Sequence, residues 1–211
     1  MGVKSWQCRP GPGGLLAGFY EPLRRRVNGG LADYLAHKAS LRPGHLVLEA
    51  GCGTAGASSM LAERAGVLSV ALDIDRDALR EARRRDPALR AVVGNLFALP
   101  FRTSVFDLAW NNSTLEHLWA PLEACREMAR VVQPDRYVFV GVPYRRGPLG
   151  FQPLIAETGL GQWIGKTFSG HSLAQMMHLA QLEPLESRHY FLRVFVGVLG
   201  RKRVTVAMKG P

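Results

Sequence analysis

Two periodicities of apolar residues alternate along this 211-residue chain. Apolar runs of strand length are separated by segments in which apolar residues recur at helical spacing. We expect strands at residues 46–48, 67–72, 89–93, 105–110 and 137–142, and helices at residues 57–64, 77–85 and 121–131. Strand and helix would then alternate five times, which is typical of an α/β fold with a doubly wound, parallel sheet and helices on both faces.

The pattern changes on either side of this region. Residues 19–39 predict a helix that Asn28-Gly29-Gly30 interrupts, and a turn follows at residues 41–44. After Tyr144 the alternation stops, and the Gly- and Pro-rich residues 145–170 are expected to form an insertion that covers the site. The remaining expected elements are a helix at 173–182, a strand at 185–191, and strand-like segments at 194–199 and 204–208, of which the pattern does not decide which joins the sheet.

Composition narrows the class of protein. A hydrophobic content of 47% is ordinary for a globular protein, and 211 residues favour a single domain. No apolar run reaches the ~18 residues that a membrane span needs, and residues 1–12 lack the apolar stretch of a secretory signal. The three cysteines form no C-x-x-C pair, so we expect no disulfide framework, no metal site and a reducing, cytoplasmic setting.

The chain is strongly basic, with a formal net charge of +10. Such an excess is typical of proteins that bind RNA, anionic lipid or an acidic substrate. It is also typical of solvated surface charge, and the arginine clusters are scattered and lack interleaved aromatic residues. A nucleic-acid partner is therefore open but not favoured. The clusters lie at residues 24–26, 83–85, 145–146 and 201–203.

The rest of the chain is organised around residues 45–56. A predicted strand leads into Glu49 and then into the glycine-dense turn Gly51-Cys52-Gly53-Thr54-Ala55-Gly56, and a helix follows. Glycine permits positive φ angles and a close approach of ligand to backbone, and the first N–H groups of a helix attract an anionic group. The turn matches G-x-G-x-x-G, which by itself is weak evidence for a dinucleotide enzyme.

Polar residues stand at the ends of the predicted strands: Glu49, Asp73, Asn95 and Asn111. In open sheets of this type a ligand binds beyond the carboxyl ends of the strands. Glu49 would repel a pyrophosphate, whereas it tolerates a ligand that carries an ammonium or sulfonium group. Asp73 can accept hydrogen bonds from both hydroxyls of a ribose, and charge-assisted bonds of this sort contribute roughly 1.5–3 kcal/mol. Asn95 can bond an adenine edge.

These segments, in this order and spacing, resemble class I S-adenosylmethionine-dependent methyltransferases, and most of all the small-molecule branch with the type-11 methyltransferase domain. The resemblance covers residues 44–143. It implies a Rossmann-like, mostly parallel seven-stranded sheet with an antiparallel last strand, and S-adenosylmethionine as the cofactor. The segments that carry it are Glu49-Ala50-Gly51-Cys52-Gly53-Thr54, Leu72-Asp73-Ile74-Asp75, 94–101, Phe106-Asp107-Leu108, Leu115-Glu116-His117-Leu118 and 130–134.

The resemblance also implies which residues line the cofactor. Glu49 would lie near its ammonium group, Asp73 would hold the ribose, and Ile74 would pack on the adenine. Asn111 would close the floor beside the methionine. The full set is Glu49, Gly51, Cys52, Gly53, Asp73, Ile74, Asn95, Leu96 and Asn111. The chain departs from the family at Ala55, where a glycine is usual, at Asn95, where an acid is frequent, and at the turn Pro134-Asp135-Arg136.

Methyl transfer needs in-line positioning of the nucleophile, and it needs a base where the nucleophile carries a proton. The candidate bases are His117, after the fourth predicted strand, and Tyr144, after the fifth. The structural alternatives are a hydrogen bond at a helix start for His117 and packing for Tyr144. His171 and His178 are further candidates, for which a surface or core role is the alternative.

We therefore expect a methyltransferase that acts on a small organic acceptor, with O- or C-methylation. Trp163 and Phe168 indicate an apolar-lined acceptor pocket. An RNA methyltransferase, an inactive cofactor-binding partner protein and a nicotinamide-dependent oxidoreductase stay open, and the oligomeric state is undetermined. The expected parts of one domain are an N-terminal arm and helices (1–40), a cofactor-binding core (44–143), a covering insertion and helix (144–182) and C-terminal strands (183–211).

Overall fold

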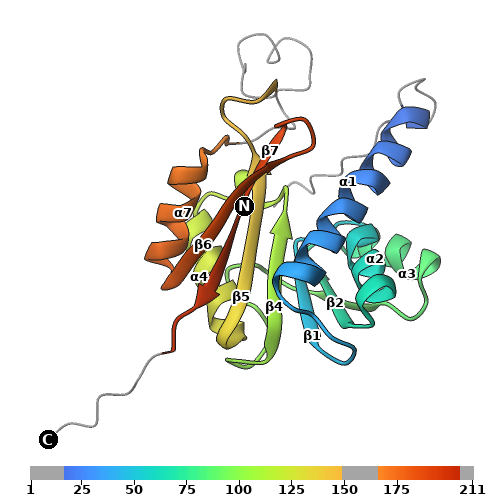
Figure 1. Cartoon of the computed structure of the whole chain (residues 1–211). Coiled ribbons are helices and arrows are strands. Elements are labelled where there is room, and N and C mark those ends of the chain that lie inside the picture. The colour runs from blue at the N-terminus through green and yellow to red at the C-terminus, as the bar shows by residue number, and fades with distance from the viewer. Residues whose placement is uncertain (1–16, 149–165, 205–211) are drawn as a thin grey trace, which may run out of the picture.

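A seven-stranded sheet runs through the middle of the molecule, in the order β3-β2-β1-β4-β5-β7-β6 (Figure 1). The computed structural model describes residues 17–148 and 166–204. Strand β7 runs antiparallel to its neighbours β5 and β6, and β1 to β5 are parallel, which confirms the predicted sheet. The strands are β1 Leu46–Ala50, β2 Leu68–Asp73, β3 Arg90–Val93, β4 Phe106–Asn112, β5 Val132–Pro143, β6 Leu182–Tyr190 and β7 Phe195–Lys202.

Helices cover both faces of this sheet, as predicted (Figure 1). Leu35 and Leu61 bring the helices of one face onto Trp110 and Phe139 of the sheet. On the other face Met128 and Met177 belong to a core that includes Phe106. The first face carries α1 Ala17–Lys38, α2 Gly56–Ala65 and α3 Arg76–Arg85, and the second carries α4 Pro121–Val131 and α7 Gly170–Leu179.

Helix α1 continues through Asn28-Gly29-Gly30, so the predicted interruption is wrong. Each glycine lowers helix propensity by about 1 kcal/mol, and a contact distant in sequence offsets this cost. Arg64 of α2 donates a hydrogen bond to the Gly29 carbonyl oxygen at 2.8 Å and pairs with Asp33 at 2.6 Å. A Cβ at Gly29 would lie 2.8 Å from the Arg64 Nη2 atom, so glycine makes room for this arginine.

The predicted five-fold alternation of strand and helix is wrong at one connection. Residues 94–105 join β3 to β4 as a loop without a helix. Two side chains of α4 replace the missing helical hydrogen bonds. Glu127 accepts from the Leu99 amide at 2.8 Å, and Arg130 donates to the carbonyl oxygens of Leu99 and Phe101, both at 2.9 Å.

The C-terminal part of the chain supplies the antiparallel strand, which the sequence pattern left undecided between two segments. Phe195–Lys202 forms β7, while residues 205–208 of the competing segment lie outside the described residues. Most of the predicted covering insertion, including Trp163, also lies outside them. At its end, Phe168 forms an isolated parallel bridge with Tyr144. Within 17–148 and 166–204, no helix is long and apolar enough to cross a membrane.

Candidate active site

The glycine turn between β1 and α2 contains two positive-φ glycines with different surroundings. Gly51 has φ 82°, and a Cβ there would lie 2.6 Å from the Thr114 Cγ2 atom. The Gly51 carbonyl oxygen also accepts a hydrogen bond from the Thr114 hydroxyl at 3.0 Å. Gly53 has φ 53°, and a Cβ there would meet nothing within 4 Å. Gly51 is therefore required by the protein's own packing, and Gly53 is the position where a ligand can approach the backbone.

Ala55 adopts the left-handed conformation, with φ 53°, immediately before α2. This conformation costs a non-glycine residue about 1–2 kcal/mol. The glycine that is usual in the family at this position would avoid this cost. Ala55 is 1% exposed, and its methyl group packs in a small core with Ala71 and Leu89. The N-cap residue Ala55 makes no side-chain hydrogen bond to the first N–H groups of α2.

Glu49 brings a buried carboxyl group to the carboxyl end of β1. It is 5% exposed, and its Oε2 atom accepts a hydrogen bond from the Ser58 hydroxyl of α2. Burial raises the pKa of the Cys52 thiol well above its usual value, and the charges of Glu49 and Asp73 raise it further. Cys52 is therefore a neutral thiol at neutral pH, and the turn favours a cationic group over an anionic one.

Asp73, the last residue of β2, holds its carboxylate against the same turn. Its Oδ2 atom accepts from the Gly53 amide at 2.6 Å, and its Oδ1 atom accepts from the Asp75 amide at 2.9 Å. A carboxylate has about four acceptor positions, so these bonds orient the group and leave acceptor capacity for a ligand. Asp75 in turn caps α3 by accepting from the amides of Asp77 and Ala78.

Apolar side chains are exposed beside Asp73. Ile74 and Val93 are each 47% exposed, and Val93 is the register partner of Asp73 on the neighbouring strand. Asn95 is also exposed, and its Oδ1 atom accepts from the Phe97 amide at 3.0 Å. Leu96, in contrast, is 6% exposed and belongs to the core. The structure thus brings Ile74 and Asn95 to the surface near Asp73, adds Val93, and places Leu96 behind them.

Asn111 is fully buried at the end of β4 and acts as a clamp. Its Nδ2 atom donates to the Ala50 carbonyl oxygen, and its Oδ1 atom accepts from the Leu115 amide at 3.3 Å. Both ends of the side chain therefore bind backbone, which ties the end of β1 to the segment after β4.

The segment after β4 carries a buried acid that the sequence pattern does not reveal. Glu116 is 2% exposed, and burial raises its pKa to about 8. Within the described part of the chain its Oε2 atom has no hydrogen-bond partner, and its Oε1 atom lies 3.8 Å from the His117 Nε2 atom. Burial lowers the pKa of His117, so its imidazole is neutral at pH 7. The sequence shows Glu116 only as part of the family-like segment 115–118, because its burial depends on packing of this segment against β5 and α4.

The other candidate bases separate into two groups. Tyr144 is 9% exposed and packs against the His189 ring, with 4.3 Å between ring centroids. Tyr144 and His171 line the same pocket. His178 lies at the other end of α7, where its Nδ1 atom is 3.4 Å from an Arg203 guanidinium nitrogen. His178 is therefore remote from the carboxyl ends of the strands.

Comparison with known proteins agrees with this geometry. Residues 48–140 match a family model described as "Methyltransferase domain". A Mycobacterium tuberculosis protein named "Probable S-adenosylmethionine-dependent methyltransferase" is 28% identical over 153 residues, which cover 68% of this chain and 56% of the relative. A malonyl-[acyl-carrier protein] O-methyltransferase of Enterobacter lignolyticus is 33% identical over 127 residues, which cover 60% of this chain and 46% of the relative.

A solved structure has the same fold. The geranyl diphosphate C-methyltransferase of Streptomyces coelicolor A3(2) gives a TM-score of 0.67 at 16% identity, with 84% of this chain and 80% of that chain covered. The chain spans about half the length of the curated relatives it matches. The predicted fold and the predicted resemblance to class I methyltransferases are thus confirmed, and the cofactor named for the Mycobacterium relative is the predicted one.

Proposed function

We propose that this chain, whose residues 48–140 match a methyltransferase domain, binds S-adenosylmethionine and transfers its methyl group to a small organic acceptor, at oxygen or carbon. One observation carries the proposal. Glu49 and Asp73 bring two carboxyl groups to the carboxyl ends of adjacent parallel strands, on either side of the Gly51–Gly53 turn. A cofactor that joins a cationic methionine end to a ribose fits this pair, because each carboxyl group meets the part of the ligand that it binds well.

The surrounding residues fit the same cofactor. The space at Gly53 admits the cofactor against the backbone, and the acceptor capacity of Asp73 suits the ribose hydroxyls. Ile74 and Val93 offer an apolar surface for adenine, and Asn95 can bond its edge. Glu49 and Cys52 would lie by the methionine end, where Gly51 shapes the turn against Thr114. Asn111 and Leu96 would support the site from behind through hydrogen bonding and packing.

The bound sulfonium would supply the methyl group and a good leaving group, so the protein's task is positioning and proton removal. His117 is the base we propose for an acceptor that carries a proton, because its lowered pKa keeps the imidazole neutral at pH 7. Tyr144 would orient the acceptor by contact, since its ring lies in a pocket wall and packs on His189.

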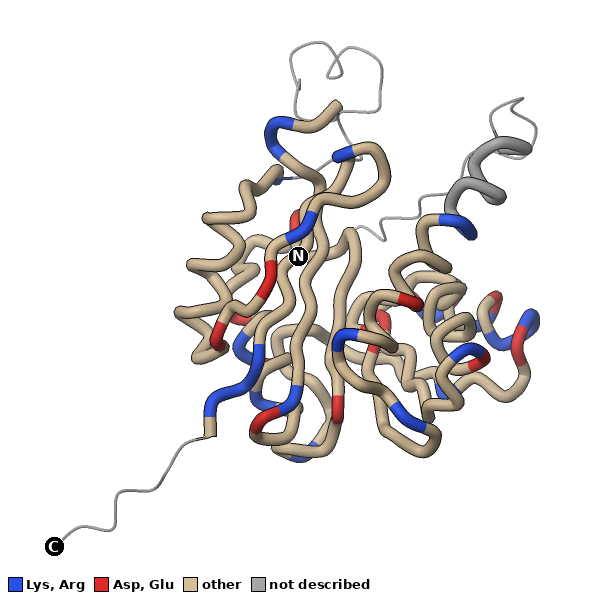
Figure 2. The backbone as a smooth tube through the Cα atoms, in the orientation of Figure 1, with Lys and Arg blue, Asp and Glu red and all other residues tan. Residues whose placement is uncertain are grey.

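The relatives support a small acceptor without naming it. Their names include malonyl-[acyl-carrier protein] O-methyltransferase and demethylmenaquinone methyltransferase, and both names describe acceptors other than nucleic acid. Figure 2 shows Lys and Arg spread over much of the described chain, with Asp and Glu among them, and not gathered in one stripe. An RNA methyltransferase would instead show RNA affinity that falls steeply with salt. We also propose that the enzyme is cytoplasmic, because its three cysteines form no C-x-x-C pair and therefore fit a reducing setting.

The test is isothermal titration calorimetry with S-adenosylhomocysteine, and with NAD in a second arm. We expect micromolar binding of S-adenosylhomocysteine, and at least tenfold weaker binding to Asp73→Ala, a loss of about 1.4 kcal/mol. Asp77→Ala is the matched control, because Asp77 is an exposed acid of the neighbouring helix that pairs only with Arg80 among the described salt bridges. Binding of NAD in preference, or equal loss in both variants, would contradict the proposal.

A cofactor-binding protein without catalysis is distinguished by a second measurement. Extract or candidate acceptors are incubated with methyl-labelled S-adenosylmethionine and the protein. Incorporated label that disappears in Asp73→Ala supports the enzyme. Tight cofactor binding with no label transferred to any acceptor would favour the partner protein.

A further inference from the structure

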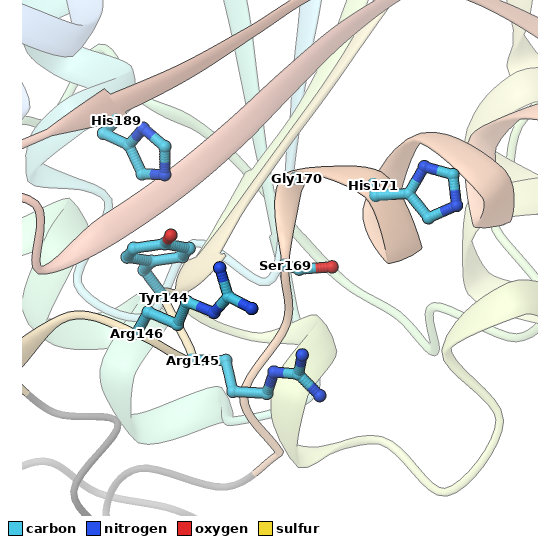
Figure 3. Close-up of a pocket in the computed structure, with 7 residues that line it drawn as sticks. All are labelled: Tyr144, Arg145, Arg146, Ser169, Gly170, His171 and His189. Carbon is cyan, nitrogen blue, oxygen red and sulfur yellow. The ribbon is translucent and has the colours of Figure 1, made fainter.

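A pocket of about 350 Å³ opens beyond the end of β5, and its lining is basic. Its walls come from three parts of the chain: the turn after β5, the start of α7 and the end of β6. Figure 3 shows the Arg146 guanidinium group between Tyr144 and Ser169, with the Arg145 guanidinium group below them in the view. The lining residues are Tyr144, Arg145, Arg146, Ser169, Gly170, His171 and His189, and none of them is an acid.

Backbone hydrogen bonds hold the arginine-bearing turn in place. The Arg145 amide donates to the Phe168 carbonyl oxygen at 2.8 Å, and the Tyr144 amide donates to the Val194 carbonyl oxygen at 2.9 Å. Gly147 closes the turn by donating to the Tyr144 carbonyl oxygen at 3.0 Å. A Cβ at Gly147 would lie 2.1 Å from the Arg193 carbonyl oxygen, so only glycine fits there. The two arginines therefore project from a fixed support.

The wall opposite the arginines is the first turn of α7. Ser169 caps this helix: its hydroxyl accepts from the Ser172 amide, and its own amide donates to the Ser172 hydroxyl oxygen. The amides of Gly170 and His171 belong to the first turn, where N–H groups have no acceptor within the helix. They add the partial positive charge of a helix N-terminus to the charges of Arg145 and Arg146. The ring of His171 itself points away from the two guanidinium groups (Figure 3).

Arg145 and Arg146 differ from other basic residues of the described chain in their ion pairing. Arg201, for example, pairs with Glu183 at 2.9 Å and Asp135 at 3.4 Å. No ion pair involves Arg145 or Arg146 within the described residues 17–148 and 166–204. The side chains of both are exposed, so they are free to form the bidentate pairs that guanidinium makes with phosphate or carboxylate.

We infer that this pocket binds an oxyanion group, a phosphate, diphosphate or carboxylate, of the acceptor whose methylation is proposed above. Arg145 and Arg146 hold the oxyanion, the N-terminus of α7 faces it, and Tyr144 packs beside the adjoining carbon atoms. The acceptor is accordingly an anionic small molecule, with its charged group at a distance from the atom that receives the methyl group. The identification of the ligand as the methyl acceptor rests on the proposed function, whereas the oxyanion site rests on the geometry of the pocket.

The distance between the two sites agrees with such a molecule. Asp73 and Tyr144 are separated by three strand spacings, from β2 across β1 and β4 to β5, or about 14 Å. Through the register of these strands Asp73 is level with Gly141, so Tyr144 lies three residues, or about 10 Å, farther along the strand direction. A cofactor that extends from Asp73 past Glu49 toward β4 crosses most of the lateral separation. The acceptor then spans the remainder.

Titration calorimetry with inorganic pyrophosphate tests the site directly, and malonate in a second arm distinguishes a phosphate site from a carboxylate site. The test variant is Arg145→Met with Arg146→Met. The matched control is Arg90→Met with Arg102→Met, which removes two exposed arginines, one at the start of β3 and one in the loop before β4. Arg146→Glu alone is a further variant, and thermal unfolding checks that each protein is folded. S-adenosylhomocysteine is titrated into all of them.

We expect at least tenfold weaker binding of one of the two anions to Arg145→Met/Arg146→Met and to Arg146→Glu. The control should bind within twofold of wild type, and S-adenosylhomocysteine affinity should stay within twofold throughout. Equal anion affinity in wild type and the test variant would overturn the inference, and so would an equal loss in the control, which would indicate net charge alone. Absence of S-adenosylhomocysteine binding by wild type would overturn the proposed function and leave the anion result to judge the pocket separately.

Discussion

The two ends of the parallel strands differ in how their charged side chains are paired. We call them the amino edge, where the parallel strands begin, and the carboxyl edge, where they end. At the amino edge, acids and bases satisfy one another. Asp107 accepts from the Leu46 amide at 2.9 Å and pairs with Arg136 at 3.2 Å, and Lys202 donates to the Val132 carbonyl oxygen at 2.6 Å. At the carboxyl edge, Glu49 and Glu116 are buried acids, and the Arg145–Arg146 turn lines a pocket whose described lining residues include no acid. The first arrangement pairs charges within the protein, whereas at the second we propose that the arginines bind a ligand.

This difference predicts that mutations at the two edges have different effects on stability and on ligand binding. A charge that is buried without a compensating partner costs stability, and such costs concentrate at functional sites. Substitutions at the carboxyl edge should therefore alter ligand binding and can raise stability. Substitutions at the amino edge should lower stability and leave ligand affinity unchanged.

The largest effect is expected at Glu116. Its pKa in the folded protein, about 8, lies above the ordinary value of 4.5, so the folded state holds a proton that the unfolded state has lost. Stability therefore falls as pH rises from about 4.5 to about 8. Glu116→Gln removes this penalty, and we expect it to be more stable than wild type by about 4 kcal/mol at pH 8 and nearly equal to it at pH 4.5. Urea unfolding at the two pH values measures the difference.

Two neighbours and one control sharpen this test. The His117 Nε2 atom lies 3.8 Å from the Glu116 Oε1 atom, and the pKa of Tyr190 is raised by burial and further by the charge of Glu116. His117→Gln should therefore keep most of the fall in stability, since the penalty comes from burial. Glu123→Gln, an exposed change on α4, should leave the wild-type pH dependence unaltered. Parallel stability curves for wild type and Glu116→Gln would show that Glu116 is not a buried, protonated acid.

The next effect is expected at Asp107, on the amino edge. Asp107→Ala leaves the Leu46 amide and the Arg136 guanidinium without their acceptor. We expect a loss of about 3 kcal/mol in the free energy of unfolding, measured by urea titration. Asp107→Asn, which keeps an acceptor for the amide, should lose about half as much. S-adenosylhomocysteine affinity of the folded protein should stay within twofold, and a tenfold loss would contradict the separation of the two edges.

A smaller effect is expected in the glycine turn, where two glycines provide a matched pair. Gly53→Ala meets open space and carries only the cost of its positive φ, about 1 kcal/mol. Gly51→Ala carries this cost and also places a Cβ 2.6 Å from the Thr114 Cγ2 atom, so we expect about 2 kcal/mol. Thermal unfolding and S-adenosylhomocysteine titration should show a loss of stability for Gly51→Ala and a loss of affinity for both. Equal stability of the two variants would remove the role assigned to Thr114.

The sequence predicts much of the fold because the elements from β1 to α4 are specified locally. The positions of Glu49 and Asp73 at or next to the ends of β1 and β2, and the bounds of α4 at Pro121 and Val131, follow from periodicity and from residues that begin or end elements. The uninterrupted helix α1 does not follow, because Arg64 contacts Gly29 across 35 residues of chain. The clamp of Asn111 and the burial of Glu116 have the same cause, since both depend on contacts between segments distant in sequence. The sequence after β5 has fewer local signals, and the basic pocket depends on three segments that are distant in sequence.

The smallest effect is expected at Arg201, which offers the direct contrast with Arg145 and Arg146. Arg201→Met removes a half-exposed guanidinium from its pairs with Glu183 and Asp135, and such surface pairs contribute under about 1 kcal/mol. Urea unfolding should therefore show a small loss, and pyrophosphate affinity should not change, because this charge is already satisfied by acids of the protein. Loss of anion binding on Arg201→Met would mean that total charge governs affinity. Unchanged binding here, together with loss at Arg145 and Arg146, would place the anion at the two arginines that have no acidic partner among the described residues.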